Sequence, residues 1–175
     1  MDNRIQLKKM KPIKSTAEIL AYKVLNRSVD EQWSTWAYEM ILAGFNTENL
    51  IILAGERKPF NQFEMKELTE KVFAELNMDY SNQEQVIKNY IYYLIERVLV
   101  TYEQDAFSVL GILMNIYNEF DHPSYLQDFY MLYFAKEDLR HGDMQWYWDG
   151  ADKNNIDEVI TNYFIEWEQK WLIEN

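Results

Sequence analysis

Signals for the start of a helix recur along this chain more regularly than any other pattern. At six places a serine or asparagine is followed three residues later by glutamate or glutamine, which is the spacing of a helix capping box. The six pairs are Ser15 with Glu18, Ser28 with Glu31, Asn61 with Glu64, Ser81 with Glu84, Ser124 with Gln127, and Asn155 with Glu158. In each pair the first side chain can accept a hydrogen bond from a free backbone N–H, and an acid at the third position lies in the positive first turn. The pattern predicts at least six helices.

The spacing of apolar residues agrees with these helix starts. Stripes at three- and four-residue steps run through residues 33–41, 86–98 and 156–172, and Asp105 can cap a further apolar run, residues 107–117, which we expect to lie deepest. Only 5 glycines and 3 prolines are present, too few turn formers for an all-β protein. We therefore predict an all-α fold, an irregular single-domain bundle of about seven or eight helices.

One domain is expected over residues 15–175, preceded by a basic and flexible N-terminal arm, residues 1–14. The arm carries a local charge of +4, and no internal repeat follows it. Residues 46–59 fit a buried strand by composition, but a short helix after Asn46 and Thr47 is the interpretation we prefer. The expected core residues are Tyr90, Leu94, Leu110, Leu113, Tyr163 and Trp167.

Composition excludes several functions. The chain has no cysteine, so it has no disulfide, no thiolate nucleophile and no zinc site of the cysteine type. A net charge of −12 argues against a nucleic-acid partner. No window resembles a secretory signal or a membrane span, so we expect no membrane association and a cytoplasmic location.

Most of the negative charge lies in the second half of the sequence. Residues 101–175 hold 15 acidic and 4 basic residues, a local charge of −11, whereas residues 15–100 have a local charge of −5. An acidic surface of this size favours a basic partner, because opposite charge speeds encounter.

Carboxylates and imidazoles that could support metal binding or acid–base chemistry are few and isolated. The candidates are Glu119 with His122, Glu137 with His141, Asp128, and Glu166. The first pair has the Glu-x-x-His spacing of a dinuclear iron centre, but a second such pair is missing and Pro123 follows at once. We expect no cofactor, no metal site and no catalytic residue, and we favour a non-enzymatic role.

A cluster of aromatic residues lies outside any helical period. Residues 141–154 are rich in turn formers and form the longest expected loop, in which Trp146, Tyr147 and Trp148 lie among three aspartates. The tryptophans either fold back onto the end of the bundle or form an anchor for a basic partner. The candidate partner-binding residues are Asp143, Trp146, Tyr147, Trp148, Asp149 and Asp152.

Residues 36–64 resemble a segment of small uncharacterised bacterial all-helical proteins. The resemblance rests on a helix that ends in Gly44-Phe45-Asn46, a leucine-rich step ending in Leu53-Ala54-Gly55, and a following helix with Phe63-Glu64. It implies a scaffold and no reaction. The overall profile, which is short, acidic, aromatic and free of cysteine, is similar to that of immunity or antitoxin-type proteins.

Three functional hypotheses follow, and we place first a non-catalytic protein that masks a basic protein partner, as an immunity-type inhibitor does. The second is a carboxylate-based enzyme or a protein that binds a divalent cation through the acids of residues 143–152. The third is a structural homo-oligomer, in which Tyr92, Tyr93 and Leu99 are buried against a second copy.

Overall fold

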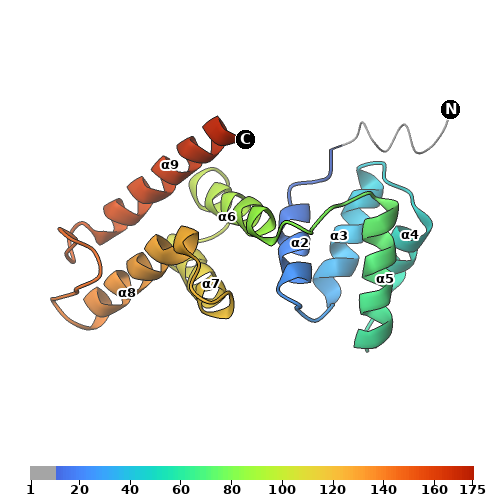
Figure 1. Cartoon of the computed structure of the whole chain (residues 1–175), viewed down its shortest axis with the longest axis horizontal. Helices are drawn as coiled ribbons and strands as arrows, with labels where there is room; N and C mark the ends of the chain where they lie inside the picture. Colours follow the sequence, from blue (N-terminus) through green and yellow to red (C-terminus); the bar gives the residue numbers. More distant parts are fainter. Residues whose placement is uncertain (1–10) are drawn as a thin grey trace. The chain divides into compact units, whose positions relative to one another are not determined.

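The computed structural model describes residues 11–175, and these residues form eight α-helices, one short 3-10 helix and no β-strand (Figure 1). The helices are α2 (Thr16–Val24), α3 (Glu31–Leu42), α4 (Glu48–Gly55), α5 (Gln62–Glu75), α6 (Gln83–Leu99), α7 (Ala106–Glu119), η1 (Ser124–Leu126), α8 (Gln127–His141) and α9 (Ile156–Glu174). The all-α prediction is confirmed. Across residues 11–175, no helix combines the length and the apolar character that crossing a bilayer requires.

The chain divides into two compact units, residues 1–90 and residues 91–175. The division falls inside α6, whose first half belongs to the first unit and whose second half belongs to the second. The single domain expected over residues 15–175 stays a prediction, because α6 is continuous through the division. Residues 1–10 of the expected N-terminal arm lie outside the described residues, and Lys11 and Lys14 are exposed.

The first unit is built around buried tryptophans of α3. Helix α3 packs against α2 and α4, and α4 packs against α5. The rings of Trp33 and Trp36 each lie 6.1 Å from the ring of Phe73 on α5, which also contacts Tyr80. The buried apolar residues of this cluster are Ile19, Val29, Trp33, Trp36, Ala37, Met40, Phe45, Leu50, Leu53, Met65, Leu68, Val72 and Phe73.

Side-chain hydrogen bonds fix this core where polar groups are buried. The indole nitrogen of Trp36 donates to Oγ1 of Thr16 at 3.0 Å, and both residues are buried. The amide of Gln62 pairs with the backbone of Val29, donating to its carbonyl oxygen and accepting from its N–H, both at 2.9 Å. The first contact connects α2 to α3. The second connects the loop that precedes α3 to the start of α5.

The segment with the bacterial resemblance forms the end of α3, all of α4 and the start of α5. Gly44 has a φ of 101°, in the left-handed region that glycine adopts without strain, and it lies just beyond the end of α3. Leu50 and Leu53 are fully buried. Residues 46–59, for which a strand was an alternative, therefore contain the short helix α4, with Thr47 at its N-cap.

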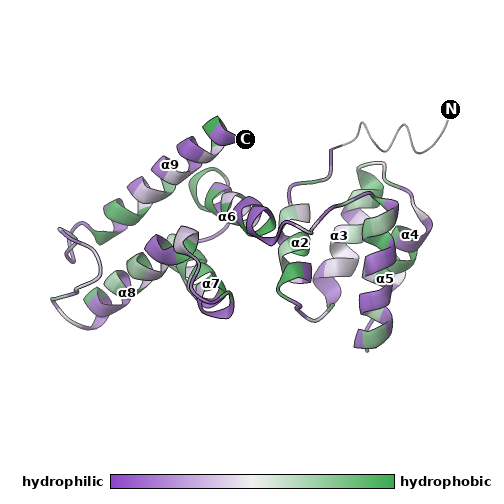
Figure 2. Ribbon diagram, in the orientation of Figure 1, coloured by the Kyte–Doolittle hydropathy of each residue, from purple (hydrophilic) through white to green (hydrophobic). Residues whose placement is uncertain are grey.

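The second unit has an aromatic cluster around Phe129 of α8. Helix α7 packs against α8, and Phe129 contacts Tyr163, Phe164 and Trp167 of α9 at ring distances of 5.3 to 6.1 Å. Figure 2 shows hydrophilic and hydrophobic residues alternating along α8 and α9, as expected of helices with one face in the core. The fully buried residues of this unit include Ile91, Leu94, Ile95, Val109, Leu110, Leu113, Leu126, Phe129, Leu132, Ala135 and Phe164.

The predicted core residues divide into two groups. Leu94, Leu110 and Leu113 are buried in the second unit and Tyr90 is buried in the first, whereas Tyr163 and Trp167 are only half-buried. Residues Tyr92, Tyr93 and Leu99, considered for a contact between copies, are also half-buried. The ring of Tyr92 stacks on that of Trp171 at 6.1 Å, so part of its surface is already covered within the chain.

Candidate functional site

The aperiodic segment between α8 and α9, residues 142–155, is a loop held in shape by its own side chains. We call these residues the tryptophan loop. The side-chain amide of Gln145 makes four hydrogen bonds to the loop backbone. It donates to the carbonyl oxygens of Trp148 (2.6 Å) and Ala151 (2.9 Å) and accepts from the N–H groups of Tyr147 and Trp148 (both 2.8 Å). One amide thereby closes residues 145–151 into a turn.

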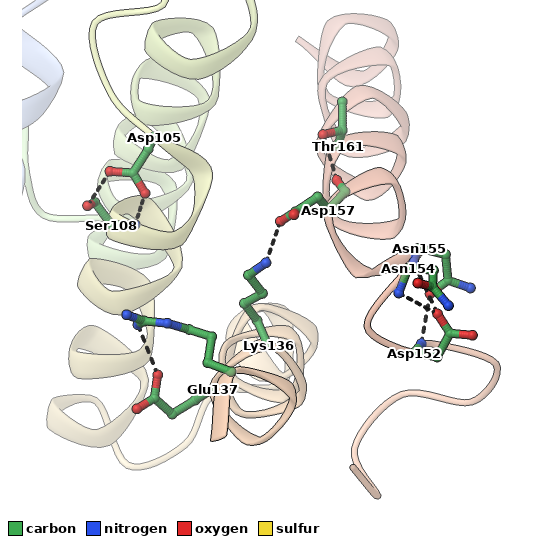
Figure 3. A network of polar contacts seen from close by, with 10 residues as sticks. Asp105, Ser108, Lys136, Glu137, Asp152, Asn154, Asn155, Asp157 and Thr161 are labelled. Atoms are coloured by element: carbon green, nitrogen blue, oxygen red, sulfur yellow. Dashed lines mark hydrogen bonds and ion pairs between the residues drawn. The ribbon is translucent and has the colours of Figure 1, made fainter. Parts of the chain in front are cut away.

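A second set of hydrogen bonds fixes the part of the loop that leads into α9 (Figure 3). The carboxylate of Asp152 accepts from the N–H groups of Asn154 (2.7 Å) and Asn155 (3.2 Å). In return, the amide of Asn155 accepts from the Asp152 N–H at 2.8 Å and donates to the Gly150 carbonyl at 2.9 Å. Gly150 has a φ of 77°, a conformation in which other residues are strained.

Two of the three predicted loop aromatics pack against the body of the second unit. The ring of Tyr147 lies 5.5 Å from that of Phe134 on α8, and the ring of Trp148 meets Tyr163 of α9 edge-on at 5.6 Å. Both side chains are half-buried. Tyr147 and Trp148 therefore attach the loop to α8 and α9.

The third aromatic residue, Trp146, points into solvent. Its side chain is 86% exposed, and that of Met144, two residues earlier, is 70% exposed. Gln145 lies between them, with its amide engaged in the turn. The loop thus presents two neighbouring apolar side chains on a backbone that is hydrogen-bonded from within.

The three predicted aspartates differ in their surroundings. Asp143 is ion-paired with Lys153 at 2.7 Å, and this lysine holds the pKa of the Asp143 carboxyl below its usual value. Asp152 is occupied by the turn that leads into α9. Asp149 is exposed and makes no hydrogen bond or ion pair with any residue of the described range 11–175. Of the three, Asp149 is the one whose carboxylate has no partner within residues 11–175.

The basic side chains of residues 101–175 all form ion pairs within the chain. All four basic residues of residues 101–175 are paired with acids: Lys136 with Asp157, Arg140 with Glu137, Lys153 with Asp143, and Lys170 with Glu174. Figure 3 shows the first of these pairs joining α8 to the start of α9 at 2.7 Å. The remaining acids of this half of the chain leave a surplus of negative charge.

The residues considered for metal or acid–base chemistry do not gather into one site. His122 lies in the turn after α7 with a φ of 61° and contacts the ring of Tyr117, while His141 lies 3.1 Å from Glu137 at the end of α8. Asp128 accepts a hydrogen bond from the hydroxyl of Tyr163, whose pKa is raised by burial and by that carboxylate. Within residues 11–175, no three histidine, aspartate or glutamate side chains gather in a way that could hold a metal ion.

Sequence reasoning missed the residues that shape the tryptophan loop. Nothing in the sequence around Gln145 marks it as a bridging residue, and Asn155 was interpreted only as a helix cap. Met144, which is exposed two residues before Trp146, was also overlooked.

No comparison with a known protein indicates a function for this chain. The chain matches no protein-family model, and no curated protein or solved structure is detectably similar to it. Function is therefore argued from the geometry and charge of the second unit.

Proposed function

We propose that this is a non-catalytic, cytoplasmic binding protein that masks a basic protein partner through the tryptophan loop, in the manner of an immunity-type inhibitor. The observation that carries the proposal is the indole of Trp146, 86% exposed on a loop whose backbone is fixed by Gln145 and Asn155. Tryptophan is the residue most enriched among those that dominate binding energy at interfaces.

The rigidity of the tryptophan loop supports this role. Binding that must first order a flexible loop loses part of its free energy to conformational entropy. In this chain the turn is closed by four hydrogen bonds from Gln145, and Tyr147 and Trp148 are packed against α8 and α9. Trp146 is consequently offered to a partner at a low entropic cost.

The charge of the second unit supports a basic partner in particular. Residues 101–175 carry a net charge of −11, and each of their four basic residues is engaged with an acid. A basic protein would be drawn toward this surface, and its approach would be faster at low ionic strength. Trp146 would then hold the complex by being buried.

The test uses the protein encoded by the reading frame next to this one, purified and titrated with the full chain. We expect it to bind, and we expect Trp146→Ala to weaken the equilibrium affinity about 30-fold, which corresponds to about 2 kcal/mol for a dominant interface residue. Leu172→Ala is the matched control. Leu172 is also an exposed apolar residue, but it lies roughly 24 Å along α9 from Ile156, given a rise of about 1.5 Å per residue.

Two results would count against the proposal. One is that the neighbouring protein does not bind. The other is that the Trp146→Ala and Leu172→Ala variants bind it equally well.

A further inference from the structure

We infer that Met144, Trp146 and Asp149 form a docking surface for an arginine side chain of the basic partner. This inference rests on the proposed function and deepens it by naming the group that the loop recognises. Trp146 and Asp149 lie within the turn that the amide of Gln145 closes by bonding to the carbonyl oxygens of Trp148 and Ala151, and Met144 directly precedes this turn.

The apolar part of this surface suits a long, flat side chain. Met144 and Trp146 are 70% and 86% exposed and lie on either side of Gln145, whose amide is used in the turn. An arginine has a hydrocarbon stem that can cover such apolar groups, and its planar guanidinium stacks on an indole face. A lysine ammonium is more strongly hydrated and gains less from the same contact.

The charged part of the surface comes from Asp149. Its carboxylate is exposed and makes no ion pair with any residue between 11 and 175, whereas Asp143 pairs with Lys153 and one oxygen of Asp152 accepts from the loop backbone. A purely apolar partner would bury Asp149 without compensation, which is unfavourable. A guanidinium that stacks on Trp146 keeps its N–H donors in its own plane, parallel to the indole and pointing outward, where a carboxylate can accept them.

Short peptides test the surface without the natural partner. The blocked peptide Gly-Arg-Gly-Arg-Gly is titrated into the ¹⁵N-labelled full chain at physiological salt, together with its lysine and citrulline counterparts. The chain has six tryptophans, and the indole N–H signal missing from the Trp146→Phe variant identifies that of Trp146. The other five signals report whether each variant remains folded.

We expect the arginine peptide to shift the Trp146 signal in a saturable manner, with an affinity at least about threefold higher than that of the lysine peptide. Citrulline, which has a similar shape but no charge, should not saturate the signal. Asp149→Asn should weaken arginine binding at least about threefold. Glu174→Gln should leave it unchanged, since this acid lies at the far end of α9, about 27 Å along the helix from Ile156.

Three results would overturn the inference: a Trp146 signal that moves no more than the other five, equal affinities for arginine and lysine, or an equal effect of Asp149→Asn and Glu174→Gln. These failures are distinct from failure of the proposed function. If the peptide binds as expected but the neighbouring protein does not bind, only the masking role is lost. If that protein binds through Trp146 but the arginine peptide does not, only the arginine surface is lost.

Discussion

The side chain of Gln145 and the backbone of Trp148 are joined by two reciprocal hydrogen bonds, in which the amide donates to the Trp148 carbonyl at 2.6 Å and accepts from its N–H at 2.8 Å. The side-chain amide thus pairs with the Trp148 backbone in the way that a backbone peptide group of a neighbouring β-strand would. It closes part of the loop between two helices into a turn, and this turn carries the exposed Trp146.

Replacing Gln145 by alanine should therefore loosen the tryptophan loop. The N–H groups of Tyr147 and Trp148 lose their acceptor, and the carbonyl oxygens of Trp148 and Ala151 lose a donor. We expect faster amide hydrogen exchange at Tyr147 and Trp148 and a loss of about 1–3 kcal/mol of local stability. Gln169→Ala, at an exposed position of α9, is the control. Unchanged exchange at both amides in Gln145→Ala would show that the turn does not depend on Gln145.

The buried contact between α2 and α3 gives a prediction about stability. In Thr16→Val the indole N–H of Trp36 loses its acceptor at 3.0 Å while the shape of the side chain is kept. A buried donor left without a partner should lower the free energy of unfolding by about 1–3 kcal/mol, as measured by urea denaturation. The exposed Thr35→Val on α3 should change it by less than about 0.5 kcal/mol.

A double-mutant cycle separates the hydrogen bond from simple loss of packing. In a Trp36→Phe background the indole N–H is absent, so Thr16→Val should cost less there than in the wild type. Equal costs in both backgrounds would mean that the Thr16–Trp36 bond contributes nothing measurable.

Alkaline pH should destabilise the first unit through Tyr22. Its hydroxyl donates to Glu18 at 3.1 Å, and burial together with that carboxylate raises the pKa of Tyr22 from 10.0 to about 12. A raised pKa in the folded state gives stability that is complete below pH 10 and is lost as the pH rises through about 12. We expect urea midpoints to fall over this interval, and to fall less in Tyr22→Phe. An identical pH dependence in both proteins would exclude Tyr22 as the cause.

Acidic pH should weaken the start of α7. Asp105 caps this helix by accepting from the Ser108 N–H at 2.9 Å, and its hydrogen bonds to Ser108 lower the pKa of the carboxyl below 3.8. At neutral pH, Asp105→Ala should reduce stability by about 1 kcal/mol. A carboxyl whose pKa is lowered in the folded state stabilises the fold fully only when the pH is above its pKa in the unfolded state. The difference in stability between Asp105→Ala and the wild type should therefore shrink as the pH falls below about 4. A difference that stays constant across this range would contradict the capping role.

The helix starts show what could be predicted from the sequence and what could not. Asn61 and Asp105 cap α5 and α7 with their side chains, as predicted. Helix α3, however, has Asp30 and not Ser28 at its N-cap, because the Asp30 carboxylate accepts from the Gln32 N–H. Where several residues that can cap a helix lie close together, the backbone conformation decides which of them caps it. Residue spacing alone does not predict that conformation.

The tryptophan loop marks a second limit of sequence reasoning. The absence of a helical period was enough to locate the loop and its aromatic cluster. Deciding which aromatic is exposed required the positions of Phe134 and Tyr163, which lie on α8 and α9 and cover Tyr147 and Trp148. Asn155 satisfies the capping-box spacing, yet its side chain bonds back to Gly150 and Asp152 in the preceding loop and not to the N–H groups of α9.

The most direct test of the account is the rate of association with the protein encoded by the neighbouring reading frame, measured by stopped flow at low and high salt. Asp149→Lys is compared with Glu174→Lys, which changes the net charge equally but lies at the far end of α9. We predict that Asp149→Lys slows association about threefold to tenfold at low salt, that Glu174→Lys slows it less, and that the difference shrinks at high salt. Equal rates for the two variants, or a rate independent of salt, would contradict the claim that the acidic tryptophan loop captures a basic partner.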